Sequence, residues 1–365
     1  MEAIHRIRTE QPYKKMWDMF YLFENEETTR TFLELRYQTI GRQNPQRDAY
    51  LATPKLIFNT KQAREYYRSA EFCDTITKPL LLYYGMVSLI KALIVTRNPE
   101  YPTSTSVLKH GLSTRKLKRE DYRFIEDDAR IQKDGLFPTF FQMFFGVTLT
   151  SQQKFPIKYM LAAIPDLRHM FERLYGPSCV ANLTISNHKN FDPSHFFKKA
   201  IQDHQDCIKP TIYSHLWVCD RSILQGAQKT KQEALDLLQT FCCEDEVYTD
   251  LETPEPEGLL QILRVAKIES TVDHPLLFYD LMGEKFLYLP KNVHLQIPEI
   301  CIHFLIMYVL GMLCRYETER WGEIIFHYSS QDLIIIHEFL SISMRKFPNL
   351  ILNKLLQETY YFYSV

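Results

Sequence analysis

The sequence predicts a mainly helical α+β protein, in which N-terminal and C-terminal helices form one bundle and a small antiparallel β-containing insertion lies between them. Two observations lead to this prediction. Apolar residues recur every three to four positions from residue 13 to about 175 and again from Pro298, which is the period of helices with a buried face. Residues 176–297 instead contain β-branched and alternating runs, which are typical of strands.

We divide the 365 residues into three parts. An N-terminal helical domain covers 1–175, a β-containing insertion or subdomain covers 176–297, and C-terminal helices cover 298–365. The last part is too apolar to stand alone, so we expect its helices to pack back on the N-terminal bundle.

The clearest helix is the stretch KPLLLYYGMVSLIKALI. Pro79 fits its first turn, where the missing N–H of proline costs no hydrogen bond, and Arg97-Asn98-Pro99 ends it. Three small residues, Gly85, Ser88 and Ala92, form a stripe along one side, so we expect a second helix to approach closely there. Apolar residues cover the other faces, which predicts a central helix.

Residues 107–138, VLKHGLSTRKLKREDYRFIEDDARIQKDGLFP, place dense positive charge beside an acidic run. We expect a tight turn at His110-Gly111, then a helix from Arg115 to about Lys133 with Gly135 as its stop. The positive charges would crowd the helix N-terminus, where the macrodipole is also positive.

An anion held by these side chains and by backbone N–H groups would relieve that repulsion. The candidate ligand-binding residues are Lys109, His110, Ser113, Thr114, Arg115, Lys116 and Lys118. The alternative is a solvated helix face, on which acidic neighbours such as Glu120 and Asp121 form ordinary surface pairs.

In the middle of the chain we expect strands in CVANLTISN, GLLQILRVAKIES and HPLLFYDLMGEKFLYLP, with a hairpin turn at Met282-Gly283-Glu284. A helix is expected in QKTKQEALDLLQTF. Beyond Pro298, which fits a helix start, Ser329 or Ser330 could cap the helix QDLIIIHEFLSISMRKF, and Pro348 is expected to end it.

Composition excludes several classes of protein. The start, MEAIHRIRTEQPYKKMW, lacks the apolar core of a signal peptide, so we expect a cytoplasmic protein. The longest apolar run, Ile300 to Cys314, is shorter than a membrane span and contains His303, which favours a buried helix and no membrane. The eight Cys form no CxxC pair and are interpreted as reduced thiols. A formal net charge of −1 excludes a generally basic nucleic-acid binder.

Two further sets of residues are candidates. Lys91 is a possible buried charge, being the one charge within an otherwise apolar helix, and its ordinary interpretation is an ammonium that reaches the surface. Arg320 and His327 match the Arg-x(4–6)-His spacing of the metal-independent HEPN ribonucleases, and residues seven apart share a helix face. Such spacings also arise by chance.

Metal and cofactor signals are missing from the sequence. No Cys or His spacing is that of a zinc site, and there is no Walker loop, GxGxxG, GxSxG or HExxH. We therefore expect no metal and no cofactor. His303 and His337, which lie on apolar helices, are interpreted as core histidines with their hydrogen bonds satisfied.

A family resemblance is carried by the stretches WDMFYLFENEETTRTFLELRY, KPLLLYYGMVSLIKALI, YPTSTSVLKHGLSTRK, QKDGLFP and RYETERW. With these stretches the sequence resembles the YaaC-like proteins of Bacillus-type bacteria. That family has no assigned catalytic residues, so the resemblance gives no role to any position. Its genes often neighbour the gene for IMP dehydrogenase, which implies a link to purine metabolism and makes that enzyme a possible partner.

The function we expect is a non-enzymatic cytoplasmic binding or regulatory protein, whose segment 109–119 contacts a phosphate-bearing ligand such as a nucleotide, or an acidic partner surface. Whether any reaction is catalysed stays open. One alternative is a HEPN-like ribonuclease that uses Arg320 and His327, and only this alternative makes RNA a partner. Another is a structural scaffold without a ligand.

Overall fold

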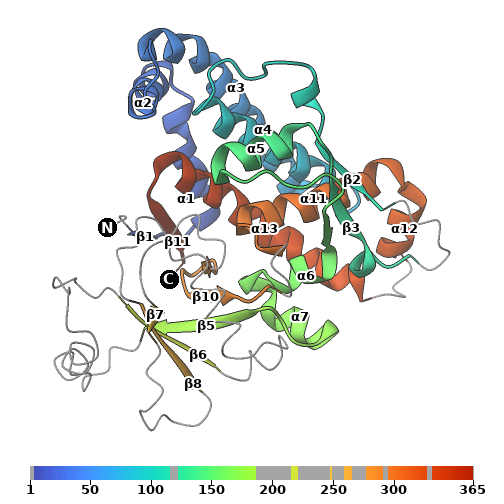
Figure 1. Ribbon diagram of the computed structural model, residues 1–365. Helices are drawn as coiled ribbons and strands as arrows, with labels where there is room; N and C mark the ends of the chain where they lie inside the picture. The colour runs from blue at the N-terminus through green and yellow to red at the C-terminus, as the bar shows by residue number, and fades with distance from the viewer. Residues whose placement is uncertain are drawn as a thin grey trace, which may run out of the picture.

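The computed structural model describes residues 4–115, 122–185, 215–220, 247–248, 259–264, 277–290, 295–326 and 331–364. It confirms the predicted class: the chain is mainly helical, with small sheets of a few strands (Figure 1). The helices form one body, and the largest sheet lies along one side of it.

Four helices make up the first part of the chain, and a short 3-10 turn at Phe20–Phe23 separates the first two. Proline stands in the first turn of three of them, where it costs no hydrogen bond. The second is capped by the Asn25 side chain, which accepts a hydrogen bond from the Thr28 N–H at 3.1 Å. The helices are α1 (Pro12–Met19), α2 (Glu26–Thr39), α3 (Pro45–Phe72) and α4 (Lys78–Val95).

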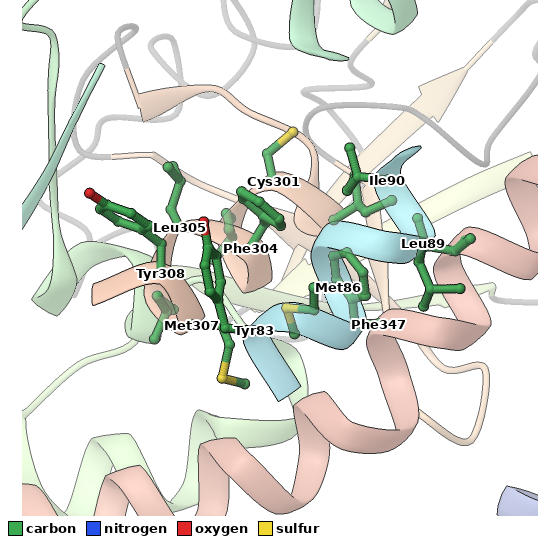
Figure 2. Packing of buried hydrophobic residues seen from close by; sticks show 14 of the residues in the cluster. Tyr83, Met86, Leu89, Ile90, Cys301, Phe304, Leu305, Met307, Tyr308 and Phe347 are labelled. Carbon is green, nitrogen blue, oxygen red and sulfur yellow. The ribbon is translucent and has the colours of Figure 1, made fainter. Parts of the chain in front are cut away.

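Helix α4 is the centre of the protein, and nearly all of its residues are buried, as the sequence predicts. The small-residue stripe allows a close approach of α3, because a Cβ atom on Gly85 would lie 2.7 Å from the Tyr67 ring. On other faces α4 contacts α11 (Glu299–Tyr316) and α13 (Asp332–Leu356). Figure 2 shows the resulting cluster, in which Tyr83, Met86 and Ile90 of α4 lie against Phe304 and Phe347.

The helix predicted from Arg115 to Lys133 is wrong. Residues 122–133 instead contain a 3-10 turn, Phe124–Glu126, and strand β3, Asp128–Ile131. Strand β3 pairs antiparallel with β2 (Leu112–Thr114) on one side and with β4 (Lys154–Pro156) on the other. Long-range pairing therefore overrides the local helical composition. Gly135 does not stop a helix either; with φ +138° it precedes α5, Leu136–Phe145.

A second antiparallel sheet confirms the strands expected in the middle of the chain. Its order is β7-β8-β6-β5-β10-β9, and β9 and β10 form the predicted hairpin, with Gly283 at φ +80° in the turn. The stretch QKTKQEALDLLQTF lies outside the described residues. The strands are β5 (Val180–Ile185), β6 (His215–Asp220), β7 (Val247–Tyr248), β8 (Leu259–Arg264), β9 (Leu277–Tyr279) and β10 (Lys285–Tyr288).

Three short helical elements lead from β4 to β5: α6 (Ile157–Ala162), a 3-10 turn (Pro165–Leu167) and α7 (Arg168–Tyr175). After α11, α12 (Thr318–Phe326) precedes α13. Pro348 does not end that helix but lies buried inside it. A proline inside a helix removes one backbone N–H donor and so weakens the helix. The residues on both sides of Pro348, Phe347 and Ile351, are buried, and their packing keeps α13 continuous.

One pair of strands joins the two ends of the sequence. Strand β1 (Ile4–Arg8) pairs parallel with β11 (Thr359–Tyr363), and neither strand was predicted. Within the described ranges, two helices are long and apolar enough to cross a membrane, namely α4 and α11. Their apolar windows are 72% and 83% buried inside the protein, as expected of core helices.

Candidate functional site

Two tyrosines from the central helices position the segment 109–115. The Tyr83 hydroxyl on α4 lies 2.7 Å from Nδ1 of His110, and the Tyr308 hydroxyl on α11 donates to the Leu112 carbonyl at 2.8 Å. Their rings are 5.7 Å apart, and Figure 2 shows the two side by side at the edge of the packed cluster. Gly311 makes room for Tyr83, because a Cβ atom there would lie 3.2 Å from it.

A close contact between two glycines fixes the same segment from the other side. Gly111 has φ +75°, and a Cβ atom on it would lie 2.3 Å from Cδ of Pro138. A Cβ atom on Gly135 would lie 2.3 Å from the Gly111 nitrogen. The first N–H groups of α5, those of Leu136 and Phe137, donate to the carbonyls of residues 109 and 110. These contacts join the stretches HGLSTRK and KDGLFP into one unit.

Three basic residues on different elements bear on this unit, of which Lys91 and Arg315 are cations and His110 is a histidine. Lys91 lies on α4, His110 begins the segment, and Arg315 lies in the last turn of α11. The Arg315 guanidinium donates to the Tyr84 hydroxyl at 2.6 Å, and the Tyr84 ring lies 5.8 Å from that of Tyr83. Among the residues that the structure describes, no carboxylate forms an ion pair with any of the three residues.

Burial and mutual repulsion affect the protonation of these groups. Burial lowers the pKa of His110 below its usual value, and the positive charges of Arg315 and Lys91 lower it further. Burial also lowers the pKa of Lys91. The charges of Lys91 and Arg315 therefore both reach His110, and the sequence had singled out two of the three residues, Lys91 and His110, as unrelated candidates.

Other cations in the protein have an evident structural role. Arg97 donates to the carbonyl of Met143 at 2.7 Å, and Arg36 donates to that of Leu355 at 2.5 Å. Both carbonyls belong to the last turns of helices, where hydrogen bonds and the macrodipole favour positive charge. The position of Arg315 at the end of α11 is favoured in the same way, whereas Lys91 and His110 lack such a partner.

The remaining predicted residues lie on or beside the same segment. The Ser113 hydroxyl accepts a hydrogen bond from Gln132 at 2.6 Å, so it supports the short sheet. Lys109 is exposed, and Thr114 and Arg115 are half-buried. Lys116 and Lys118 lie outside the described residues. Arg115 is not helical and residues 122–133 form a turn and a strand, so the described part of the segment offers no helix N-terminus to hold an anion.

Arg320, the first half of the ribonuclease candidate, is already partnered. Its guanidinium pairs with Glu317 and lies 5.5 Å from the centre of the Tyr122 ring. The Tyr122 hydroxyl donates to the buried Asp127 carboxylate at 2.6 Å. Burial raises the pKa of Asp127 to about 6, despite this hydrogen bond. His327 lies outside the described residues.

The predicted ligand-binding segment and the ribonuclease candidate were singled out separately in the sequence, but residues next to each of them are in contact in the fold. Tyr122 directly follows residues 116–121, which include Lys116 and Lys118, and it contacts Arg320. Arg123 lies 3.8 Å from Asp332, whose other oxygen accepts the Phe124 N–H at 2.7 Å. Asp332 in turn follows residues 327–330. Residues 122–124, which lead to the short sheet, therefore meet the start of α12 at Arg320 and the start of α13 at the buried Asp332.

A hollow of about 470 Å³ lies elsewhere, at the turn between α2 and α3. Arg42 in its wall is neutralised by Asp48 at 2.7 Å and by Glu100 at 3.6 Å. The hollow is lined by Gly41, Arg42, Gln43, Asn44, Arg47, Asp48, Leu51, Pro99 and Glu100. Its charges are balanced, unlike those around His110.

Sequence reasoning missed a buried ionic cluster. The ammonium of Lys346 is 3% exposed; it pairs with Asp166 and lies 2.6 Å from Glu299. Next to it, Nδ1 of His303 lies 2.9 Å from the Ser343 hydroxyl, whereas its buried Nε2 lies 3.9 Å from Glu299 without a hydrogen bond. His303 is therefore a core histidine as predicted, but only one of its nitrogens is satisfied, and His337, predicted to be a second core histidine, is exposed. The Ser–His–Glu row resembles a hydrolase triad, but these side chains are buried in the core, so substrate has no access. The sequence offered one signal of this cluster, namely that Lys346 lies within an apolar helical run.

No metal site is evident in the described part of the chain, where no three His, Cys, Asp or Glu side chains gather to hold an ion. The fold and the site together define a mainly helical α+β protein whose two central helices present uncompensated cations beside tyrosines. The chain belongs to the YaaC-like protein family, whose model matches residues 21–355. No curated protein and no solved structure matches the chain.

Proposed function

We propose that this protein is a non-enzymatic cytoplasmic binding or regulatory protein that holds a phosphate-bearing ligand, or an acidic partner surface, between Lys91, His110 and Arg315. One observation carries the proposal: the charges of Lys91 and Arg315 both act on His110, and no described carboxylate pairs with any of the three residues. Like charges held near one another in a partly buried place repel. An anion would turn that repulsion into attraction.

The hydrogen-bond donors of the three side chains suit a phosphate group. Lysine and arginine are the usual phosphate ligands, one as a compact charge and the other as a planar donor. In the tautomer in which the Tyr83 hydroxyl donates to Nδ1, His110 keeps an N–H at Nε2 for the ligand. Lys109 and Arg115, on the same segment, would extend the positive surface.

The test is thermal unfolding of the purified protein with inorganic phosphate, nucleotides and short RNA. A ligand at 100 times its dissociation constant should raise the unfolding free energy by about 2.7 kcal/mol. Lys91→Met and Arg315→Gln should remove the shift. Arg68→Gln, which removes an exposed charge of α3 without an ion pair among the described residues, should keep it.

If no ligand shifts the transition, the proposal fails in its small-molecule form and the scaffold alternative gains. The link to purine metabolism and to IMP dehydrogenase comes from the family resemblance alone, and the purine nucleotides in the panel test it. The ribonuclease alternative gains no support from Arg320, because Glu317 pairs with its guanidinium. Cleavage of the short RNA that disappears in Arg320→Gln would revive it.

A further inference from the structure

Tyrosine rings extend outward from the cations of the proposed site. The Arg315 guanidinium lies 4.8 Å from the centre of the Tyr316 ring, which is 64% exposed. On its other side Arg315 bonds the Tyr84 hydroxyl, and the Tyr84 ring stacks on Tyr66 at 5.9 Å and 27°. The rings therefore continue from the buried Tyr83 and Tyr308 to the surface.

Tyr316 lies close to the inner rings as well. Burial raises the pKa of Tyr308 to about 12, the nearby Tyr316 adds to this rise, and the Tyr308 ring lies 5.9 Å from that of His110. An exposed aromatic face thus lies beside the anion-binding cations. Arg315 belongs to both parts, because its guanidinium contacts the Tyr316 face while it adds charge to the site.

We propose that the ligand is a nucleotide, whose phosphate lies among Lys91, His110 and Arg315 and whose base stacks on Tyr316. This inference rests on the proposed function and adds the class of ligand. A sugar phosphate would fill the cation cluster but leave the aromatic face unused. A nucleotide carries both a phosphate and a planar ring, as the two parts of the site require.

The geometry also indicates which property of the base is recognised. Stacking tolerates every base, because each presents a π-face. We therefore expect adenine and uracil nucleotides both to bind, with the larger purine binding more tightly.

Calorimetric titration with AMP, UMP, ribose 5-phosphate and inorganic phosphate tests this inference. Base stacking should make AMP bind about 10-fold or more tightly than ribose 5-phosphate. Tyr316→Ala should remove that difference and leave ribose 5-phosphate binding unchanged, whereas Tyr316→Phe should keep it. Tyr50→Ala, which removes a tyrosine of α3 that is 65% exposed, is the matched control and should change nothing.

The outcomes separate the inference from the proposed function. If phosphate and ribose 5-phosphate bind through Lys91 but AMP binds no more tightly, the nucleotide inference is overturned and the proposed function stands. If Tyr316→Ala weakens all four ligands equally, the ring acts only by orienting Arg315, which also overturns the inference. If none of the four ligands binds, both proposals fall together.

Discussion

The Tyr83 hydroxyl and Nδ1 of His110 lie 2.7 Å apart, and this hydrogen bond joins the central helix α4 to the basic segment 109–115. Burial raises the pKa of Tyr83 well above its usual value and lowers that of His110. Both groups are therefore neutral at pH 7. The bond fixes the imidazole without charge, so any anion must provide the energy to protonate it.

Tyr83→Phe should cost about 1–3 kcal/mol of unfolding free energy, because the buried Nδ1 of His110 loses its partner. Urea denaturation measures the loss, and the imidazole nitrogen shifts of His110 should change with it. Tyr308→Phe is the matched control, since it releases the Leu112 carbonyl instead. Unchanged His110 shifts in Tyr83→Phe would contradict the assigned bond.

Anion binding should depend on pH through His110. Sulfate keeps its charge between about pH 5 and 8, so it isolates the titration of the protein. Because a bound anion favours the imidazolium form, sulfate affinity should rise as pH falls through the lowered pKa of His110, below the ordinary value of about 6.5. His110→Gln should flatten the profile. A flat profile in the unmodified protein would remove His110 from the site.

Lys346→Met should destabilise the protein by about 3–5 kcal/mol, because it leaves Asp166 and Glu299 buried without their cation. Chemical denaturation measures this change. Lys61→Met, on the exposed face of α3, should cost little. The triple variant Asp166→Asn, Glu299→Gln, Lys346→Met should recover much of the loss, because neutral groups of similar size need no ion pair. A triple variant as unstable as Lys346→Met would point to lost packing instead.

Gly111→Ala and Gly146→Ala form a matched pair, since both positions have positive φ, +75° and +68°. Each variant should lose about 1–2 kcal/mol from the left-handed backbone. Gly111→Ala should lose about 1–3 kcal/mol more, because its Cβ meets Pro138, whereas nothing lies within 4 Å of a Cβ at Gly146. Equal losses in thermal or urea unfolding would mean that the Gly111–Pro138 contact can give way to a methyl group.

Asp127 should make the protein less stable as pH rises. Its folded pKa of about 6 lies above the ordinary 3.8, so the folded state holds the proton more tightly. This stabilisation is fully present below about pH 4 and is lost by pH 6–7, up to about 3 kcal/mol. Asp127→Asn should lack this dependence, so its stability relative to the unmodified protein should rise between pH 4 and 7. The exposed Asp134→Asn, as control, should show no such trend.

Local sequence signals were sufficient for α4, α11 and the β9–β10 hairpin. Proline at the helix starts, long apolar runs and a glycine turn act within a few residues, and these elements form as predicted. Local signals failed at 122–133. The charged composition of these residues predicted a helix, but they contain the four-residue strand β3. That strand depends on its pairing with β2 and β4, which composition does not reveal.

The candidate site could be predicted only in part for the same reason. Lys91 and His110 stood out, one as a lone charge in an apolar helix and the other beside a glycine in a basic run. Arg315 did not, because a cation at the end of a helix is ordinary. The charge of Arg315 reaches His110 only because α11 packs against α4. The cluster of Lys346, Asp166 and Glu299 likewise joins distant segments.

The parallel pairing of β1 with β11 has a consequence for how the protein is made. During synthesis on the ribosome, β1 emerges before every other described element and β11 after all of them. The earliest strand must therefore wait, with its backbone groups unpaired, until translation reaches residues 359–363. A nascent chain halted after α13 should already bury its central helices while leaving β1 without its partner, exposed to proteases and chaperones.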